Sequence, residues 1–531
     1  MPNPKARPCD EAAIRAVSAS ADCNESAKPW VLAVTILAST ISYIDESVVN
    51  VALPTIEADL KASAAVTQWL VNAYMLSLTA LVLVGGAAGD QLGRRRVFIA
   101  GVAIFAAASL WCGLSGDIAQ LILARAVQGA GAALLIPCAL AIIGATFGES
   151  ERGRAIGTWA AFSAVSAAFG PVLGGWIVDH TSWRWIFLIN PLIALPTILI
   201  ALRHVPESRD PQAPAGLDWP GALLAFIGLG ALVYGLIAAP GRGWSDALVI
   251  ASIVAGALLL ALFIRMEQRA DPPMMPLALF RSRMFAGVNG LTLLLYAGLG
   301  GVMFFLPFLL IQVHGFSATL AGAAFLPFTV IMATLSRWSG GLIDRFGARL
   351  PLIVGPTIAA AGLLLLAMPG AANTYLTLLA PMTVLALGMV VTVAPLTTSV
   401  INAVPERQAG TASGINNGVA SLASLLAIAI LGAVALDAHN RALDRQLASP
   451  ALSAEVRQAV SQARGKFAAE VTLQGEERKV AEAIVRQSLG EGIRIALWIA
   501  AALALLAALT AALTIPPRRK AEALKPEPAP G

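Results

Sequence analysis

The sequence predicts an all-α membrane protein with 14 transmembrane helices, built as two parallel six-helix bundles with a two-helix insert between them. The first observation is composition: 57% of the 531 residues are apolar and 13% are charged, whereas a soluble domain carries roughly 25% charged residues. The second is a set of fourteen apolar segments, each near the length of about 20 residues that crosses a bilayer. The third is an internal repeat. Together they exclude a water-soluble globule.

The spans follow in order from apolar runs that end at charged residues, prolines or glycines. The N-terminal bundle, residues 29–204, holds spans at 30–54, 66–89, 97–115, 118–146, 153–178 and 186–204. Residues 205–271 form a polar linker and the insert, with spans at 220–239 and 246–266. The C-terminal bundle, residues 272–515, holds spans at 285–312, 319–343, 350–368, 375–400, 408–436 and 491–514.

The repeat supports this division more strongly than hydropathy does. Four residues of the first half recur 254 positions later in the second half: Gly86, Asp90, Gly93 and Arg95 match Gly340, Asp344, Gly347 and Arg349. The pair Glu151-Arg152 recurs 255 positions later as Glu406-Arg407. Parallel repeats are a transporter architecture. The alternative is chance, in which a Gly-x-x-x-Asp pattern simply ends a helix twice.

The distribution of Lys and Arg predicts the orientation. Most of the 36 basic residues fall in the segments assigned to the inner side, and such a bias marks cytoplasmic loops. The tails 1–28 and 516–531 are therefore expected in the cytoplasm. Residues 1–28 lack the apolar stretch of a signal peptide, so the first span is expected to remain as an anchor.

Alternation alone places one long loop, residues 437–489, outside. It carries apolar residues at helical spacing, which favours short amphipathic helices over the outer mouth; they are Leu452, Val456, Val460, Phe467, Val480, Ile484 and Leu489. Whether they guard the pathway or merely remain soluble stays open.

Asp45 and Glu46 are the only carboxylates deep inside a predicted span. A charge there is costly, about 2.5 to 3.5 kcal/mol on insertion scales, so such residues usually face a cavity or a partner. Neighbouring helix positions point about 100° apart, so we expect one of the pair to face the pathway, and favour Asp45. It would hold a proton and lose it when a cationic ligand arrives. The alternative is a carboxylate that pairs with Arg125 for stability alone.

Arg125 is the matching base inside a span. Small residues follow it, from Ala126 to Ala133, and let a neighbouring helix come close enough for the guanidinium to reach a carboxylate or carbonyls. We expect it to tune the charge of Asp45, and a purely structural clamp on carbonyls is the alternative.

Two groups of residues are candidates for gating. The turn after the second span combines glycines for a tight turn with charges that can form a latch, and its copy does the same; they are Gly86, Asp90, Gly93, Arg94 and Arg95, and Gly340, Asp344, Arg345, Gly347 and Arg349. The fifth span is interrupted by Gly170, Pro171, Gly174 and Gly175, which predict a packing seam or hinge.

Polar and aromatic residues within spans are candidates for a cavity that holds a flat cationic or amphipathic ligand. They are Asn50, Trp69, Asn72, Tyr74, Phe304, Phe305, Gln312, Asn416 and Asn417. For any single aromatic, lipid contact or core packing is the alternative. The four cysteines, Cys9, Cys23, Cys112 and Cys138, form no CxxC motif and no cluster with histidine, so we expect free thiols and no metal.

These motifs resemble the major facilitator superfamily, and specifically its fourteen-span drug:proton antiporter branch. The first span from Ile44 to Pro54 looks like that branch's first-helix motif, with Ser47 where Thr is usual. Residues 86–96 and 340–349 are similar to the superfamily's loop motif and its second-half copy, although Gln91 replaces a usual base. Residues 125–133 and 170–175 resemble the fourth-helix and fifth-helix motifs, and residues 183–187 with Asn190-Pro191 the branch's connector.

The resemblance implies alternating access and proton-coupled export of amphipathic, often cationic, compounds, with Asp45 handling protons or cations. The proton gradient would drive export, with no cofactor. The implied partners are a small amphipathic substrate, protons and the lipid bilayer of the cell inner membrane, and no nucleic acid. Some members work with a periplasmic adaptor, which nothing in this chain shows.

An exporter of one specific metabolite or siderophore would carry the same motifs and is the main alternative. An enzyme is not expected, because the chain has no GxxxxGK[ST] loop, no HExxH motif and no pair of histidines at helical spacing.

Overall fold

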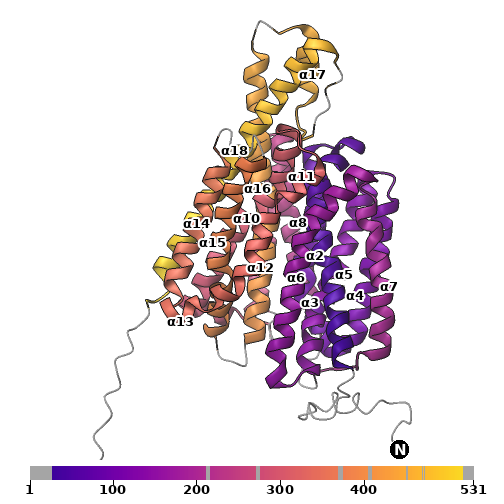
Figure 1. Ribbon diagram of the computed structural model, residues 1–531, viewed down its shortest axis with the longest axis vertical. Helices are drawn as coiled ribbons and strands as arrows, with labels where there is room; N and C mark the ends of the chain where they lie inside the picture. Colours follow the sequence, from indigo (N-terminus) through magenta and orange to yellow (C-terminus); the bar gives the residue numbers. More distant parts are fainter. Residues whose placement is uncertain are drawn as a thin grey trace, which may run out of the picture.

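The computed structural model describes residues 27–210, 216–270, 275–368, 375–404, 409–449, 452–468, 471 and 473–517, and within these ranges all regular structure is helical. The helices stand side by side in two bundles, with a smaller helical cap at one end (Figure 1). We call the end that carries the cap the loop side and the opposite end, where Lys28 and Thr514 lie, the terminal side. The predicted tails, apart from Ala27, Lys28, Pro516 and Pro517, lie outside the described residues.

The N-terminal bundle holds the six predicted helices: α2 (Lys28–Asp59), α3 (Ala64–Leu92), α4 (Arg94–Leu114), α5 (Ile118–Thr146), α6 (Glu149–His180) and α7 (Trp185–His204). Side chains at helix starts accept hydrogen bonds from free backbone N–H groups, as Ser63 does for α3 and Asp117 for α5. Glycines bring α3 and α5 into backbone contact, because a Cβ at Gly85 or Gly129 would overlap the other helix.

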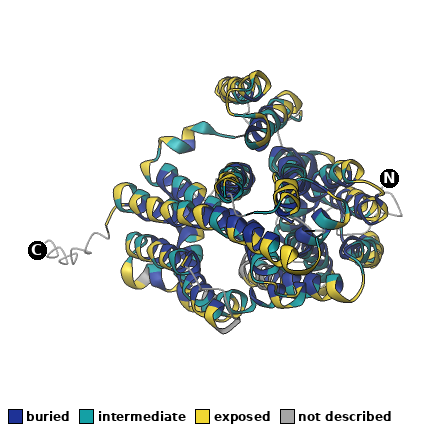
Figure 2. Ribbon diagram, turned by 90° about the horizontal axis from the view of Figure 1, so that it is seen from above, coloured by how far each residue is buried: buried dark blue, intermediate teal, exposed yellow. Residues whose placement is uncertain are grey.

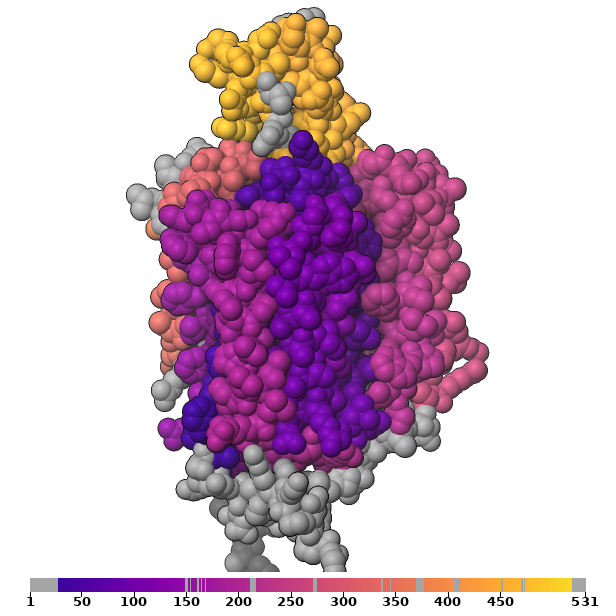
Figure 3. Space-filling view, turned by 90° about the vertical axis from the view of Figure 1, so that its right-hand side faces the viewer, coloured from indigo at the N-terminus to yellow at the C-terminus, as the bar shows by residue number. Residues whose placement is uncertain are grey.

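The insert consists of α8 (Trp219–Arg242) and α9 (Ala247–Glu267), which form an antiparallel pair. Helix α8 packs against α3 and α16, whereas most of α9 is exposed along its length. Figure 3 shows the pair as a column beside the N-terminal bundle. Its exposed residues are largely apolar, as expected for a helix that faces lipid.

The C-terminal bundle contains η2 (Leu277–Arg281), α10 (Arg283–Phe308) with the π turn η3 (Leu309–Val313), α11 (Ala318–Ala323), α12 (Leu326–Gly340), α13 (Leu342–Phe346), α14 (Arg349–Leu366), α15 (Tyr375–Asn402), α16 (Ala409–Leu447) and α18 (Gly475–Thr514). The predicted span 319–343 is divided among α11, α12 and α13, and the stretch Ala318–Leu335 is long and apolar enough to cross a bilayer. Pro327 lacks the N–H that would continue α11, and it lies in the first turn of α12 instead.

Thirteen helices in the described part of the chain are long and apolar enough to cross a bilayer. Helix α6 is not among them, but it is 32 residues long and packs lengthwise on α2. It therefore completes the six helices of the N-terminal bundle. Buried residues turn toward the middle of each bundle and exposed ones toward its outside (Figure 2). The all-helical, multi-span membrane fold is confirmed.

The cap corrects the predicted loop 437–489. Helix α16 continues to Leu447 and α18 begins at Gly475, so only residues 448–474 connect them, and these include α17 (Ala454–Gln462). The three helices extend beyond the bundles because they share a small apolar core, which includes Leu443, Val456 and Val460. Of the predicted apolar positions, Val456 and Val460 lie on α17, whereas Val480, Ile484 and Leu489 lie on the extended α18.

Candidate functional site: a cavity between the bundles

A cavity of about 400 Å³ lies between the two bundles. Helices α2, α3 and α6 line it from one bundle, and α10, α12 and α16 from the other. Its wall is mainly apolar, with aromatic rings and three methionines, Met75, Met303 and Met332. Such a wall suits an apolar or aromatic molecule of drug size.

Among the described residues that line this cavity, Glu46 is the only carboxylate, and none of them is Lys, Arg or His. Asn50, one helical turn further along α2, also lies on the wall, and its amide donates to the backbone carbonyl of Glu46 (3.1 Å). Hydroxyl groups complete the polar lining; they belong to Tyr43, Ser47, Tyr296, Thr329 and Ser424. The cavity thus combines one acidic group with an apolar wall.

Asp45 points away from the cavity into the N-terminal bundle, where it is only 1% exposed. One carboxylate oxygen pairs with the guanidinium of Arg125. The other accepts hydrogen bonds from the side-chain amides of Gln128 (2.8 Å) and Asn190 (2.9 Å). Both amides also donate to the hydroxyl of Ser109. This network joins α2, α4, α5 and α7 around one buried charge.

Arg125 has further partners in the same network. It donates to the side-chain oxygen of Gln128 (2.7 Å) and to the backbone carbonyl of Leu70 (3.4 Å), and it lies 4.4 Å from the ring centre of Tyr74. Arg125 therefore has both of its predicted kinds of partner, a carboxylate and a backbone carbonyl.

The expectation that Asp45 faces the pathway is wrong for this structure, in which Glu46 occupies the wall. The sequence identified both carboxylates. It did not show which of them faces the cavity, because α2 is buried on several sides. Gln128 and Asn190 were missed as partners of Asp45. Gln128 follows Arg125 by three positions and so shares its helix face, which is a signal that the sequence does contain.

The other predicted cavity residues are not on the wall, with the exception of Asn50. Phe304 and Phe305 pack against each other and against Phe467 of the cap, and Phe304 also packs against Phe308. Asn416 donates to Asn289 (3.1 Å) and Thr292 (2.7 Å) inside the C-terminal bundle. The remaining residues also lie away from the cavity: Trp69, Asn72, Tyr74, Gln312 and Asn417. Polarity within a span does not reveal which neighbour a side chain meets.

The turn between α3 and α4 brings together two of the residues that we predict to form a latch. Asp90 accepts from Arg94 (2.9 Å), and Gly93 adopts the left-handed region with φ of +112°. The sequence did not reveal Glu207, which lies in the stretch taken as a linker. Its carboxylate accepts from the backbone N–H of Arg95 (3.0 Å) and lies 3.8 Å from that guanidinium and 3.5 Å from that of Arg96.

The second-half copy takes a similar turn, since Gly347 also has a positive φ of +74°. Arg349 donates to the carbonyl of Ala512 on α18 (2.7 Å), and the Arg345 guanidinium lies 5.3 Å from the ring centre of Phe346. Among the described residues, nothing outside the local helix lies within 4 Å of a Cβ placed at Gly340, so none of them makes a close helix contact there. The side chain of Asp344 lies outside the described residues.

The glycines of α6 form the predicted packing seam. Gly170 and Gly174 lie against Ser47 and Val48 of α2, and Gly175 lies against the backbone of Ala318 in the other bundle. One turn further on, Asp179 accepts hydrogen bonds from the backbone N–H groups that begin α11, at 3.1 Å from Ala318 and 2.7 Å from Thr319. This contact joins the bundles at the loop side.

The cap adds two further contacts to the N-terminal bundle. The carboxylate of Glu57, at the end of α2, accepts from the backbone N–H groups of Phe467 (2.7 Å) and Ala468 (2.8 Å). The N–H of Ala64 donates to the carbonyl of Gly465 (2.9 Å). These contacts of the cap, like those of Asp179 with α11, lie at the loop side.

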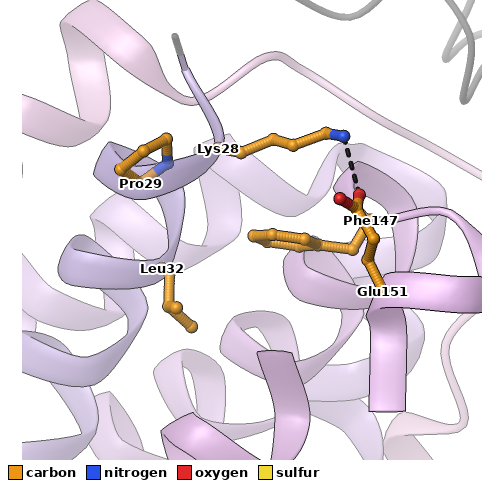
Figure 4. A pocket seen from close by; sticks show the side chains of 5 residues that line it. All are labelled: Lys28, Pro29, Leu32, Phe147 and Glu151. Carbon is orange, nitrogen blue, oxygen red and sulfur yellow. Dashed lines mark hydrogen bonds and ion pairs between the residues drawn. The ribbon is translucent and has the colours of Figure 1, made fainter. Parts of the chain in front are cut away.

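At the terminal side, an ion pair joins two helices of the same bundle. The ammonium of Lys28 lies 2.7 Å from the carboxylate of Glu151 on α6, across a groove of about 400 Å³ that also contains Phe147 (Figure 4). The pair links α2 to α6, so it does not hold the two bundles together.

Two helical bundles around a central cavity, with a repeated turn in each half, define a transporter. The chain belongs to the Major Facilitator Superfamily, whose family model matches residues 35–428.

Curated relatives cover nearly the whole chain. The tetracenomycin C resistance and export protein of Streptomyces glaucescens is 34% identical over 507 residues, which cover 93% of this chain and 92% of that protein. The puromycin resistance protein of Streptomyces alboniger is 36% identical over 456 residues, with 85% and 90% covered. The multidrug resistance protein Stp of Mycobacterium tuberculosis is 33% identical over 471 residues, with 87% of each chain covered.

Solved structures share the fold. A bacterial homologue of the human lysosomal transporter Spinster, in an inward-facing and occupied conformation, has a TM-score of 0.65 at 16% identity and covers 93% of this chain and 97% of its own. The D-xylose-proton symporter has a TM-score of 0.59 at 16% identity, with 92% and 98% covered.

Proposed function

We propose that this protein is a proton-coupled antiporter that exports amphipathic, chiefly cationic, drugs or toxic compounds across the cell inner membrane by alternating access. The observation that carries the proposal is Glu46, a single carboxylate on the wall of an apolar cavity between the bundles. Relatives that match most of the chain are named as resistance and export proteins. The proton gradient drives the cycle, and no cofactor takes part.

Glu46 is the group at which a proton and a cationic substrate compete. An apolar, water-poor wall favours the neutral carboxyl, so the group holds a proton in the absence of a cation. A positive charge in the cavity favours the carboxylate, and the proton then leaves. The proton and the cationic substrate therefore cannot both be bound at Glu46 at the same time, as antiport requires.

Asp45 and Arg125 support this step from behind the wall. Asp45 is held in place by three donors, the guanidinium of Arg125 and the side-chain amides of Gln128 and Asn190. Arg125, held by Asp45, places a fixed positive charge behind Glu46 in the same bundle and opposes its full neutralisation. Their neighbour Tyr74, which is fully buried, packs its ring against the guanidinium of Arg125.

Alternating access requires the loop-side contacts to break. The structure has these contacts in place, at Gly175 with Ala318 and at Asp179 with α11, which corresponds to a state closed at the loop side. With both termini in the cytoplasm, the cavity loads a substrate from the cell or the bilayer and releases it at the loop side. The ion pair of Asp90 and Arg94 lies at the terminal side, and we assign it to the state that is closed on that side.

Export of one specific metabolite is a second candidate. It is favoured by relatives whose names give a single compound, such as tetracenomycin C and puromycin.

Inverted membrane vesicles test the proposal. A proton gradient should drive uptake of lipophilic cations such as ethidium by the wild-type protein, and a protonophore should abolish it. Glu46→Gln should lose gradient-driven uptake by at least tenfold, whereas Glu482→Gln, on the cap, should not. Uptake that ignores the protonophore would disprove proton coupling. Uptake of only one compound from a broad panel would favour the second candidate.

A further inference from the structure

Two carboxamides of α3 are buried without a hydrogen-bond partner among the described residues. Neither the oxygen nor the nitrogen of the Gln68 and Asn72 side chains has one, and both residues are 0% exposed. An unpaired polar group in an apolar contact is unfavourable, and buried amides are usually satisfied. Two such residues one helical turn apart therefore call for an explanation.

Their position lies at the closed seam between the bundles. Gln68 faces Gly432 of α16, where an added Cβ would overlap the carboxamide. Residues four apart share a helix face, so Asn72 points toward the same seam. Helices α3 and α16 belong to different bundles, so this contact opens and closes if the bundles move relative to each other.

The seam is the direct continuation of the cavity. Val71 and Met75 of α3 line the cavity, as do Ser424 and Ile428 of α16. From there α3 approaches the loop side through Asn72 and Gln68, and α16 approaches it through Gly432. The unpaired carboxamides therefore lie on the line from the cavity to the loop side, beneath the contacts that close it.

We propose that Gln68 and Asn72 line the exit half of the transport path and hydrogen-bond to polar groups of the substrate as it leaves. This inference rests on the proposed export function. In the closed state the two carboxamides are sealed between helices without partners. When α3 and α16 separate, water and the carbonyl, hydroxyl or amine groups of an amphipathic substrate satisfy them. Gly432 leaves room for the carboxamide on closure, because a larger residue would occupy its place.

Cysteine labelling tests the exposure. The four native cysteines are replaced, and Gln68→Cys and Asn72→Cys are each treated with a charged, membrane-impermeant thiol reagent from the loop side. Glu477→Cys, exposed on the cap, identifies vesicles with that side accessible. The matched control is Ser77→Cys, which is 2% exposed and lies about half a helical turn away from the seam-facing side at 100° per residue.

With ethidium and a proton gradient present, positions 68 and 72 should react at least tenfold faster than in resting vesicles, and position 77 should not change. Equal, slow labelling at all three positions in vesicles that export ethidium would overturn the inference. Faster labelling that persists with a protonophore would support the exit path and contradict proton coupling. A failure of the exit-path inference is therefore distinguishable from a failure of the proposed proton coupling.

Substrate contact has its own measurement. Gln68→Leu and Asn72→Leu should keep the equilibrium affinity for ethidium in the cavity within twofold and lower the maximal export rate at least fivefold. A lower export rate at unchanged affinity would distinguish lost substrate contact from a packing defect. A packing defect would lower the amount of folded protein and leave the export rate per molecule unchanged. An unchanged rate per molecule in both variants would refute the contact.

Discussion

Asp45 and Glu46 are neighbours in the chain, yet their carboxylates lie in different surroundings. Asp45 is sealed in the N-terminal bundle with Arg125, Gln128 and Asn190, and Glu46 lies on the wall of the cavity between the bundles. Successive residues on a helix point about 100° apart, which is sufficient to separate them. One acidic pair thus supplies a fixed charge for the bundle and a carboxylate for the path.

Removing one partner of the buried pair should destabilise the protein strongly. Arg125→Met leaves Asp45 without its counter-charge, and breaking a buried pair costs about 3–5 kcal/mol. We expect a large loss of thermal stability in detergent, measured by fluorescence of a thiol dye or by loss of the monodisperse peak. The control is Arg242→Met, in an exposed pair at the end of α8, which should change stability little. Equal stability of both variants would show that the network does not hold the bundle.

The amides around Asp45 should matter less than the pair itself. Asn190→Leu removes one donor to the carboxylate and one to Ser109, and an unmet buried group costs about 1–3 kcal/mol. We expect a measurable decrease in melting temperature that is smaller than that of Arg125→Met. A larger decrease than that of Arg125→Met would contradict this ranking.

A side chain at Gly175 should wedge the bundles apart at the loop side. A Cβ there would overlap the backbone of Ala318, so Gly175→Leu should expose the loop-side seam and reduce export. The readout is the labelling of a cysteine at position 72 in the same protein, which should become faster without substrate. Gly157→Leu is the matched control on α6, because nothing outside its own helix lies within 4 Å of a Cβ at that position. Similar labelling in both variants would argue against a closing contact at Gly175.

Glu57 should hold the cap on the N-terminal bundle. Glu57→Leu removes the acceptor for the N–H groups of Phe467 and Ala468, so residues 464–468 should come loose. Trypsin added from the loop side would then cut after Arg464 or Lys466 faster than in the wild type. Glu57→Gln keeps an acceptor oxygen and should stay near the wild-type rate. Equal rates in all three proteins would remove Glu57 from this role.

Glu207 should order the turn between α3 and α4. It accepts from the N–H of Arg95 and lies near the guanidinium groups of Arg95 and Arg96. Glu207→Ala should therefore increase hydrogen exchange at residues 93–96 and slow export, with the isosteric Glu207→Gln intermediate. Unchanged exchange in the alanine variant would assign the order of this turn to Asp90 and Arg94 alone.

The sequence by itself determined the features that depend on local pattern. Apolar runs set the spans, because a backbone in lipid must satisfy its own hydrogen bonds within a helix. Glycine at 93 and 347 permitted the same left-handed turn in each half. Asp45, Glu46 and Arg125 were identified because a charge inside a span is costly and so needs a function or a partner.

Only the tertiary structure decided which side chains meet. Spans that are apolar all round have no solvent-exposed face. The local sequence therefore could not show that Glu46 lies on the cavity wall and Asp45 inside the bundle. Gln128 and Asn190 are 83 and 145 positions from Asp45, and Glu207 lay in a polar stretch with no motif. Helices α16 and α18 extend into the residues predicted as a loop, because they pack against each other and against α17. Packing between segments far apart in the chain, rather than the pattern within one segment, determines partners, cavities and seams.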